Sequence, residues 1–263
     1  MKQAFAAVIL IALAAGMASS QTPARSRFEV ASIRQSDPGA GGTQIGLSPG
    51  GTFNAKNVTL KALIQNAYDV RDFQISGGPG WLDSERYDIV AKGQNTGVSE
   101  DDIRTMTDQQ RNALKENLVS RVRALLEERF ELKVHRETKE MPVYALVTAK
   151  TGAKIQVHDG PPANSLSVRR DDAGRSAVTA QGVPVASLVK LLSNQVGRTV
   201  LDQTGLKGNY DFKMTFAPDL ATTDSDGPSI FTALQEQLGL RLDAQKGLVE
   251  VLVIDSAQRA SEN

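Results

Sequence analysis

The chain has 263 residues, no cysteine, and 30 basic against 30 acidic side chains. The lack of cysteine excludes disulfides, thiolate metal sites and a thiol nucleophile. The balanced charge argues against nucleic-acid binding, which normally requires a basic excess to meet phosphate. Aromatic residues make up only 5% of the chain, so a large stacking platform for bases or sugars is not expected.

The first twenty residues have the pattern of a secretory signal. Lys2 is followed by an apolar run over 4–15 and then by the small residues Ala18, Ser19 and Ser20, which predicts cleavage after Ser20. The run is shorter than the roughly 20 residues of a membrane span, although an uncleaved anchor is the alternative. No cysteine follows it, so a lipoprotein is excluded. We expect a periplasmic or secreted protein with no membrane span after signal removal.

The chain that follows the signal begins with a strand and then a helical unit. Residues 28–33 alternate and predict a strand, and a Gly/Pro-containing loop follows over 37–51. Residues 53–58 predict a second strand, after which Thr59 is suited to cap a helix. The spacing i, i+3, i+4, i+7 gives that helix one apolar face: Leu60, Leu63, Ile64 and Ala67.

The same unit occurs a second time, 125 residues later. Residues 178–183 predict the strand, and Pro184 suits the first helical position because its missing N–H would be unpaired there. The apolar helix face repeats at the same spacing: Val185, Leu188, Val189 and Leu192.

Two further blocks match in the same order. Residues 85–90 match 208–213, which aligns Tyr87-Asp88 with Tyr210-Asp211. Residues 126–134 match 234–242, each the end of an amphipathic helix that runs into a strand. In the first copy this helix is longer, from about Asp108 to Arg129. Closing strands are expected over 143–149 and 249–254. Three matched blocks in one order predict an internal duplication.

These elements predict an α+β fold. It comprises two related strand–helix–strand–strand–helix–strand modules packed together, with small mixed sheets and helices on one face. The expected organisation follows the sequence blocks: signal 1–20, first module 21–150, polar linker 151–175, second module 176–257 and tail 258–263.

Motifs for catalysis or metal binding are missing. His135 and His158 have no zinc-type spacing, and no serine lies in a Gly-x-Ser-x-Gly elbow. The segment Asp224-Ser-Asp-Gly227 resembles part of a calcium loop. Thr222 would then occupy the first ligand position and Ala233 the closing carboxylate position, and neither residue meets the oxygen-ligand requirement of such a loop. We therefore expect no metal, no cofactor and no catalytic residue.

The segment with the best functional prospects is 75–82, Ile-Ser-Gly-Gly-Pro-Gly-Trp-Leu. Its glycines and Pro79 impose an unusual backbone, and the only tryptophan of the chain, Trp81, follows. An exposed tryptophan on a shaped loop is a common binding anchor, with Asp83, Arg86 and Tyr87 as polar neighbours. The alternative is that Trp81 fills the core between helix and sheet.

Several of these segments together resemble a known family. They are Phe28–Ile33, Ile75–Leu82, Arg86–Ala91, Phe130–Arg136, Met141–Ala145 and Ser229–Gly239. The chain looks like a family of exported proteins from soil-dwelling bacteria, described only as a domain of unknown function. That domain also occurs joined to membrane metallopeptidases of the β-lactam-sensor type, which implies an extracytoplasmic sensing or partner-binding role. The metallopeptidase zinc motif is absent, so its catalysis does not transfer.

Each half is also similar, more weakly, to the short N-terminal modules of secretins and TonB-dependent receptors. Ala233-Leu234, Leu238-Gly-Leu240 and Val249–Ile254 carry that similarity. Such modules bind partner proteins without doing chemistry, an analogy at the level of fold.

The function that the sequence predicts is therefore non-enzymatic. We expect an exported module of the cell envelope that binds a protein or a small ligand, at a sheet edge or in the cleft between the halves. The alternative is an envelope hydrolase that uses Asp83 or Asp88 with Glu85, since paired acids cleave glycosides when about 5–10 Å apart. The oligomeric state is left open.

Overall fold

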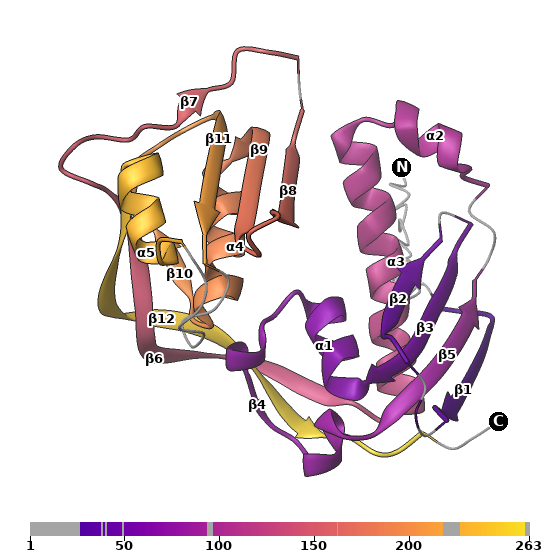
Figure 1. The fold of residues 1–263 in the computed structure, drawn as a ribbon. Coiled ribbons are helices and arrows are strands. Elements are labelled where there is room, and N and C mark those ends of the chain that lie inside the picture. The colour runs from indigo at the N-terminus through magenta and orange to yellow at the C-terminus, as the bar shows by residue number, and fades with distance from the viewer. Residues whose placement is uncertain are drawn as a thin grey trace, which may run out of the picture.

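The computed structural model describes residues 27–37, 39, 41–48, 50–93, 97–161, 163–217 and 227–260. The expected signal peptide and the calcium-like segment before Gly227 lie outside these residues. Each half of the chain builds one four-stranded antiparallel sheet, and a third, mixed sheet joins the halves (Figure 1). The predicted α+β class with small mixed or antiparallel sheets is confirmed.

The first half is a sheet with two helices on one face. Its strand order is β1-β5-β3-β2, with bounds β1 (Val30–Gln35), β2 (Gln44–Leu47), β3 (Thr52–Thr59) and β5 (Arg86–Lys92). Strand residues alternate between a buried and an exposed face, and α1 (Leu60–Tyr68) and α3 (Asp108–Arg129) cover the buried face. Shorter helices lie in the connections: η1 (Asp72–Gln74), η2 (Gly80–Asp83) and α2 (Glu100–Thr105).

The second half repeats this arrangement with a shorter second helix. Its strand order is β7-β11-β9-β8, with bounds β7 (Gln156–Val157), β8 (Ser165–Arg170), β9 (Ser176–Pro184) and β11 (Asn209–Phe216). The helices are α4 (Val185–Val196) and α5 (Ile230–Ala233), and α5 continues as the π-helical η3 (Leu234–Leu238). Each strand occupies the place that its counterpart has in the first sheet.

The third sheet exchanges strands between the halves. Its two long strands, β6 (Lys133–Thr148) and β12 (Leu240–Ser256), form an antiparallel ribbon along the base of the molecule (Figure 1). β4 (Ile75–Gly77), from the first half, pairs in parallel with the end of β12. β10 (Val200–Asp202), from the second half, pairs in parallel with the end of β6. The end of β12 therefore completes the first half, and the end of β6 completes the second half.

The pairing of the ribbon is symmetric. Val134 pairs with Ile254, and Leu242 pairs with Leu146. Adding 108 to 134 gives 242, and adding 108 to 146 gives 254, so the register maps onto itself when the two halves are exchanged. The pair Glu140 and Leu248 lies at the centre of this symmetry. The shared strand order and register are the arrangement that a duplication would produce.

The predicted helix starts agree closely with the structure. Thr59 caps α1, and its hydroxyl accepts a hydrogen bond from the Ala62 amide. Pro184 lies one position earlier than predicted, as the cap of α4 instead of its first residue. The predicted apolar faces are buried, except that Val189 is only partly so.

Two features of the predicted organisation differ from the structure. The interval 151–175, expected as a linker, contributes β7 and β8 to the second sheet. β8 forms a hairpin with β9, the next strand along the chain, whereas the very short β7 exists because the distant strand β11 offers it a free edge. The expected closing strands 143–149 and 249–254 are the ends of β6 and β12 and not separate elements.

Candidate functional site

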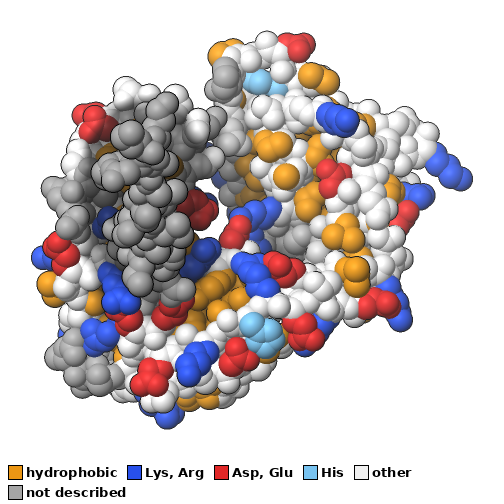
Figure 2. All heavy atoms as spheres, turned by 180° about the vertical axis from the view of Figure 1, so that it is seen from behind, with side chains coloured by type: hydrophobic (Ala, Val, Ile, Leu, Met, Phe, Trp, Pro, Cys, Tyr) orange, Lys and Arg blue, Asp and Glu red, His pale blue; other side chains and the backbone are white. Residues whose placement is uncertain are grey.

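The most prominent hollow in the described structure is a cleft of 1080 Å³ on the first half where it meets the second, which contributes only Lys190, Asn194 and Gly197 to the lining. Its walls come from α1, from the first four turns of α3, from β2 and β3, and from the end of α4. Figure 2, seen from behind, shows the halves as two lobes that meet along their lower edge, with acidic and basic side chains along that joint. The cleft is within the size range of small-molecule sites.

The cleft exists because the first half has a longer second helix than the second half. Subtracting 108 from 230, the first residue of α5, gives 122, so the part of α3 before Val122 has no counterpart in the second half. This part projects beyond the sheet, and one of its faces lines the cleft: Arg111, Leu114, Lys115, Leu118, Val119 and Val122. The spacing of these residues is that of a single helical face.

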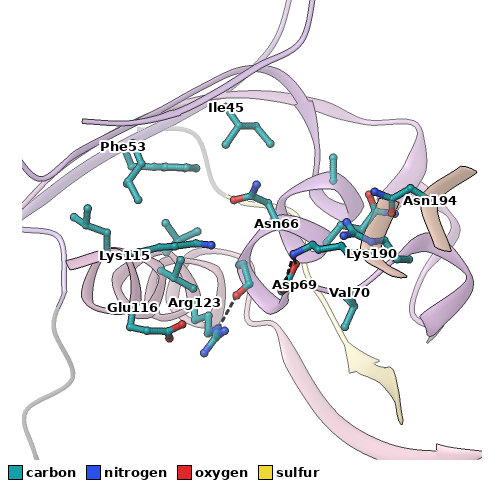
Figure 3. Close-up of a pocket in the computed structure, with 18 of the residues that line it drawn as sticks. Ile45, Phe53, Asn66, Asp69, Val70, Lys115, Glu116, Arg123, Lys190 and Asn194 are labelled. Carbon is teal, nitrogen blue, oxygen red and sulfur yellow. Dashed lines mark hydrogen bonds and ion pairs between the residues drawn. The ribbon is translucent and has the colours of Figure 1, made fainter. Parts of the chain in front are cut away.

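Apolar side chains form the inner wall of the cleft. Phe53 is 2% exposed, Leu118 and Val122 are each 4% exposed, and Ile45 and Leu47 are partly buried. Figure 3 shows Ile45 and Phe53 on the sheet side, opposite α1. The accessible part of this wall comes from partly buried side chains of the sheet and of α3: Ile45, Leu47, Leu114 and Val119. Water in contact with these side chains would be released by an apolar ligand, which favours binding.

Charged side chains gather around Asp69 at the end of α1. Lys190 of α4 donates hydrogen bonds to both carboxylate oxygens of Asp69, at 2.7 and 2.9 Å. This bridge lowers the pKa of Asp69, and the charges of Arg71 and Lys115 lower it further. In Figure 3, Lys115 extends from α3 toward α1. One carboxylate is thus surrounded by three cations, which leaves a local positive excess.

Arg123 fixes the distance between α1 and α3. Its Nε donates to the carbonyl oxygen of Ala67 at 2.7 Å, and its guanidinium lies 5.2 Å from the centroid of the Tyr68 ring. The hydrogen bond occupies a carbonyl at the end of α1 that has no helical partner. Arg123 therefore holds the two helices that form the walls of the cleft.

The sequence-predicted site lies elsewhere, on the far side of α1. Trp81, in η2, is partly buried against the core of the first half. Arg259, near the C-terminus, lies 5.4 Å from the centroid of the Trp81 ring and also binds Glu85 through 2.6 and 2.8 Å contacts. Pro79 caps η2 and is partly buried. The chain's own tail thus occupies one face of the tryptophan.

The polar residues of the predicted site do not converge on Trp81. Asp83 is exposed and pairs with Lys61 at 3.2 Å, while Arg86 donates to the carbonyl oxygen of Asn57 at 2.8 Å. Tyr87 is 1% exposed, and burial, together with its hydrogen bond to Glu85, raises its pKa to about 12. These side chains support the local fold.

We expect that the Arg259→Ala variant exposes Trp81. Loss of the guanidinium uncovers the ring, so the acrylamide quenching constant of its fluorescence should rise roughly twofold. Arg241→Ala, which breaks an ion pair with Asp243 in the second half, is the control and should leave quenching unchanged. Wild-type quenching as strong as that of a free tryptophan derivative would contradict this placement.

The repeated Tyr-Asp pair has a structural explanation. Asp88 accepts a 2.9 Å hydrogen bond from the backbone amide of Asn57, at a bulge of β3 where φ is +53°. At the equivalent bulge of β9, Gly182 has φ +62° and donates to Asp211 at 2.7 Å. Each carboxylate satisfies an amide that the bulge removes from the strand ladder, and its pKa is lowered by hydrogen bonds.

His158 attaches the segment before β8 to this second bulge. Its Nε2 lies 2.9 Å from the Pro161 carbonyl oxygen, and its Nδ1 lies 2.9 Å from a carboxylate oxygen of Asp211. These two acceptors raise the pKa of His158. His135 lies at the surface beside Asp255. The two histidines lie in different halves and do not share a site.

Sequence reasoning allowed for binding in a cleft between the halves but named none of the residues that line this cleft, although one signal for it was present. The first copy of the duplicated unit has a longer second helix, and its unmatched turns are those that line the cleft. Asp69, Arg71 and Lys190 belong to no motif, and they meet only because the two halves are joined by the crossing strands.

Over the described residues, no group of three or more histidine, aspartate or glutamate side chains is arranged to hold a metal ion. Within the same part of the chain, no helix combines the length and the apolar character needed to cross a bilayer.

Comparison with known proteins gives a family and no activity. No curated protein and no solved structure matches the chain. Residues 61–257, which run from α1 to the end of β12 and leave out β1, β2 and β3, match a protein family described as "protein of unknown function". The expected resemblance to a domain of unknown function is thereby confirmed, and the chain belongs to this family, DUF3738.

Proposed function

We propose that this protein is an exported, non-enzymatic binding protein whose ligand occupies the cleft where its two halves meet. The observation that carries the proposal is the cleft of 1080 Å³, with partly buried apolar side chains on one side and charged side chains at its rim. A concave apolar surface with a few convergent polar groups is the usual form of a small-molecule site. Export, predicted from residues 1–20, would place that function in the periplasm or outside the cell.

The carboxylates of the hydrolase alternative are engaged in other contacts. Glu85 is bound by Arg259 and Tyr87, which lower its pKa in that order. Asp88 has a lowered pKa because it accepts from Asn57, Ser36 and Arg34. A glycosidase needs one acid whose pKa is raised so that it can protonate the leaving group. These contacts favour binding over hydrolysis.

The proposal predicts that the cleft binds an apolar probe and that filling the cleft prevents this. Purified protein should enhance the fluorescence of N-phenylnaphthylamine, a neutral dye that emits strongly in apolar surroundings. Asn66 is exposed on α1 and lines the cleft, so Asn66→Trp should weaken dye binding at least about tenfold by occupying the space.

Gln195→Trp is the matched control. Gln195 is an exposed amide on α4 outside the lining of the cleft, and its variant should bind the dye as the wild type does. Equal melting temperatures would show that both variants fold. If the wild type gives no enhancement, or if Asn66→Trp binds the dye unchanged, the cleft is not the binding site.

A further inference from the structure

The charges at the rim of the cleft are unbalanced. Five basic and three acidic residues line it: Arg71, Arg111, Lys115, Arg123 and Lys190 against Asp69, Asp72 and Glu116. Asp72 is additionally paired at 2.6 Å with Lys61, a cation outside the lining, so its negative charge does not offset the basic residues of the cleft. The chain as a whole has equal numbers of basic and acidic side chains, so this local excess is a property of the cleft.

The basic side chains differ in how they are engaged. Arg111 donates to the Met106 carbonyl oxygen, and Arg123 to that of Ala67, so both serve the ends of helices. Lys190 is bound to Asp69. Arg71 and Lys115 act on Asp69 through their charges alone and add to the field at the same point. An incoming anion would meet three cations and one carboxylate there.

The apolar wall lies beside this charged cluster. Ile45, Phe53, Asp69, Lys115 and Lys190 all line the same cleft. Figure 3 shows Lys115 extending from α3 toward the end of α1, where Lys190 bridges to Asp69. A ligand that satisfies both surfaces must have an apolar body and an anionic end. A purely apolar ligand would leave the cations without an anion, and a purely polar one would leave the wall in contact with water.

We infer that the cleft takes a small amphiphilic anion, with its apolar body against Leu47, Leu114 and Val119 and its carboxylate or phosphate at Arg71, Lys115 and Lys190. This inference rests on the proposed binding function and assigns the ligand class. A fatty acid and a lipid phosphate share the required chemistry, because both join a charged head to an alkyl chain.

The test compares three ten-carbon probes that displace N-phenylnaphthylamine from the purified protein. Decanoate and decyl phosphate carry the anionic head, whereas decanol is neutral. We expect at least one anionic probe to displace the dye at a concentration about tenfold lower than decanol does. Its advantage should shrink in 0.5 M salt, where charges are screened over about 4 Å. Preference for decanoate identifies a fatty-acid type of head, and preference for decyl phosphate a phosphate head.

Charge variants test the assignment of the head group. Arg71→Gln combined with Lys115→Gln should weaken binding of the preferred anion about tenfold, a larger loss than the same variant shows for the neutral dye. Asp69→Asn, which removes the carboxylate from the cluster, should instead tighten it by a fewfold. Lys213→Gln, which removes one positive charge from the exposed face of β11, is the control for each single charge change and should leave binding of the anion unchanged.

Two outcomes separate the inference from the proposed function. If decanol matches both anions and the charge variants bind them as the wild type does, the ligand class is wrong, while the cleft remains a binding site. If no probe displaces the dye and Asn66→Trp has no effect, the site itself is wrong.

Discussion

Residues 1–150, produced without the rest of the chain, should fail to fold. They contain every strand and helix of the first half, but β12 completes that half with Leu252 and Ile254, which are 1% and 3% exposed. Val249 and Val251 pack with Val143 in the adjoining cluster. Burying each such side chain contributes about 1.5–3 kcal/mol, so four contribute roughly 6–12 kcal/mol. That is comparable with the entire stability of a typical domain, about 5–15 kcal/mol.

Circular dichroism and thermal melting would measure this effect. The fragment alone should show no cooperative transition, whereas co-expression with residues 151–263 should give a complex that melts cooperatively and restores the emission of Trp81. The full chain is the reference. A fragment 1–150 that melts cooperatively by itself would show that the exchange of β6 and β12 is dispensable to the first half.

Asp88→Ala should lower the free energy of unfolding by about 2–4 kcal/mol. The substitution leaves the amide of Asn57 and the hydroxyl of Ser36 without their acceptor, and a buried polar group without a partner costs about 1–3 kcal/mol. The exposed ion pair with Arg34 adds little. Urea unfolding followed by circular dichroism gives the value.

Asp83→Ala is the control, because that carboxylate is exposed and pairs only at the surface. Its stability should change by less than about 0.5 kcal/mol. Equal losses for Asp83→Ala and Asp88→Ala would contradict the role that we assign to the bulge.

The contribution of Asp88 should also depend on pH. Hydrogen bonds, first from Asn57, lower its pKa from the ordinary value of 3.8. A carboxyl whose pKa is lower in the folded state stabilises the protein above its unfolded pKa, and this contribution is lost as the pH falls through the folded pKa. The difference between wild type and Asp88→Ala should thus be full at neutral pH and shrink below about pH 4.

The two Tyr-Asp pairs, which the sequence marks as a repeat, have the same structural role in both halves. Asp88 and Glu85 were candidates for catalysis because acids close in sequence can act as a pair. The structure places Asp88 at the bulge of β3 and Asp211 at the equivalent bulge of β9. The repetition therefore reflects the backbone requirement of β3 and β9, which any chain with these bulges would share.

Local rules were sufficient for the helices and central strands. The apolar spacing of Leu60, Leu63, Ile64 and Ala67 requires one buried helix face, and alternation along 85–90 requires a half-buried strand, because each pattern matches the geometry of its own element. The capping hydroxyl of Thr59 likewise acts on an amide only three residues away. The matched blocks indicated two similar halves because each block carries the local pattern of one helix or strand.

Tertiary structure alone decided how the halves combine and where a ligand could bind. β7 forms because the distant strand β11 offers it an edge, and the crossing of β6 and β12 depends on a register between residues about 100 positions apart. Asp69 and Lys190, 121 positions apart, meet only after that crossing. Sequence determines what a segment can form with its neighbours; the cleft, which depends on long-range packing, required the folded chain.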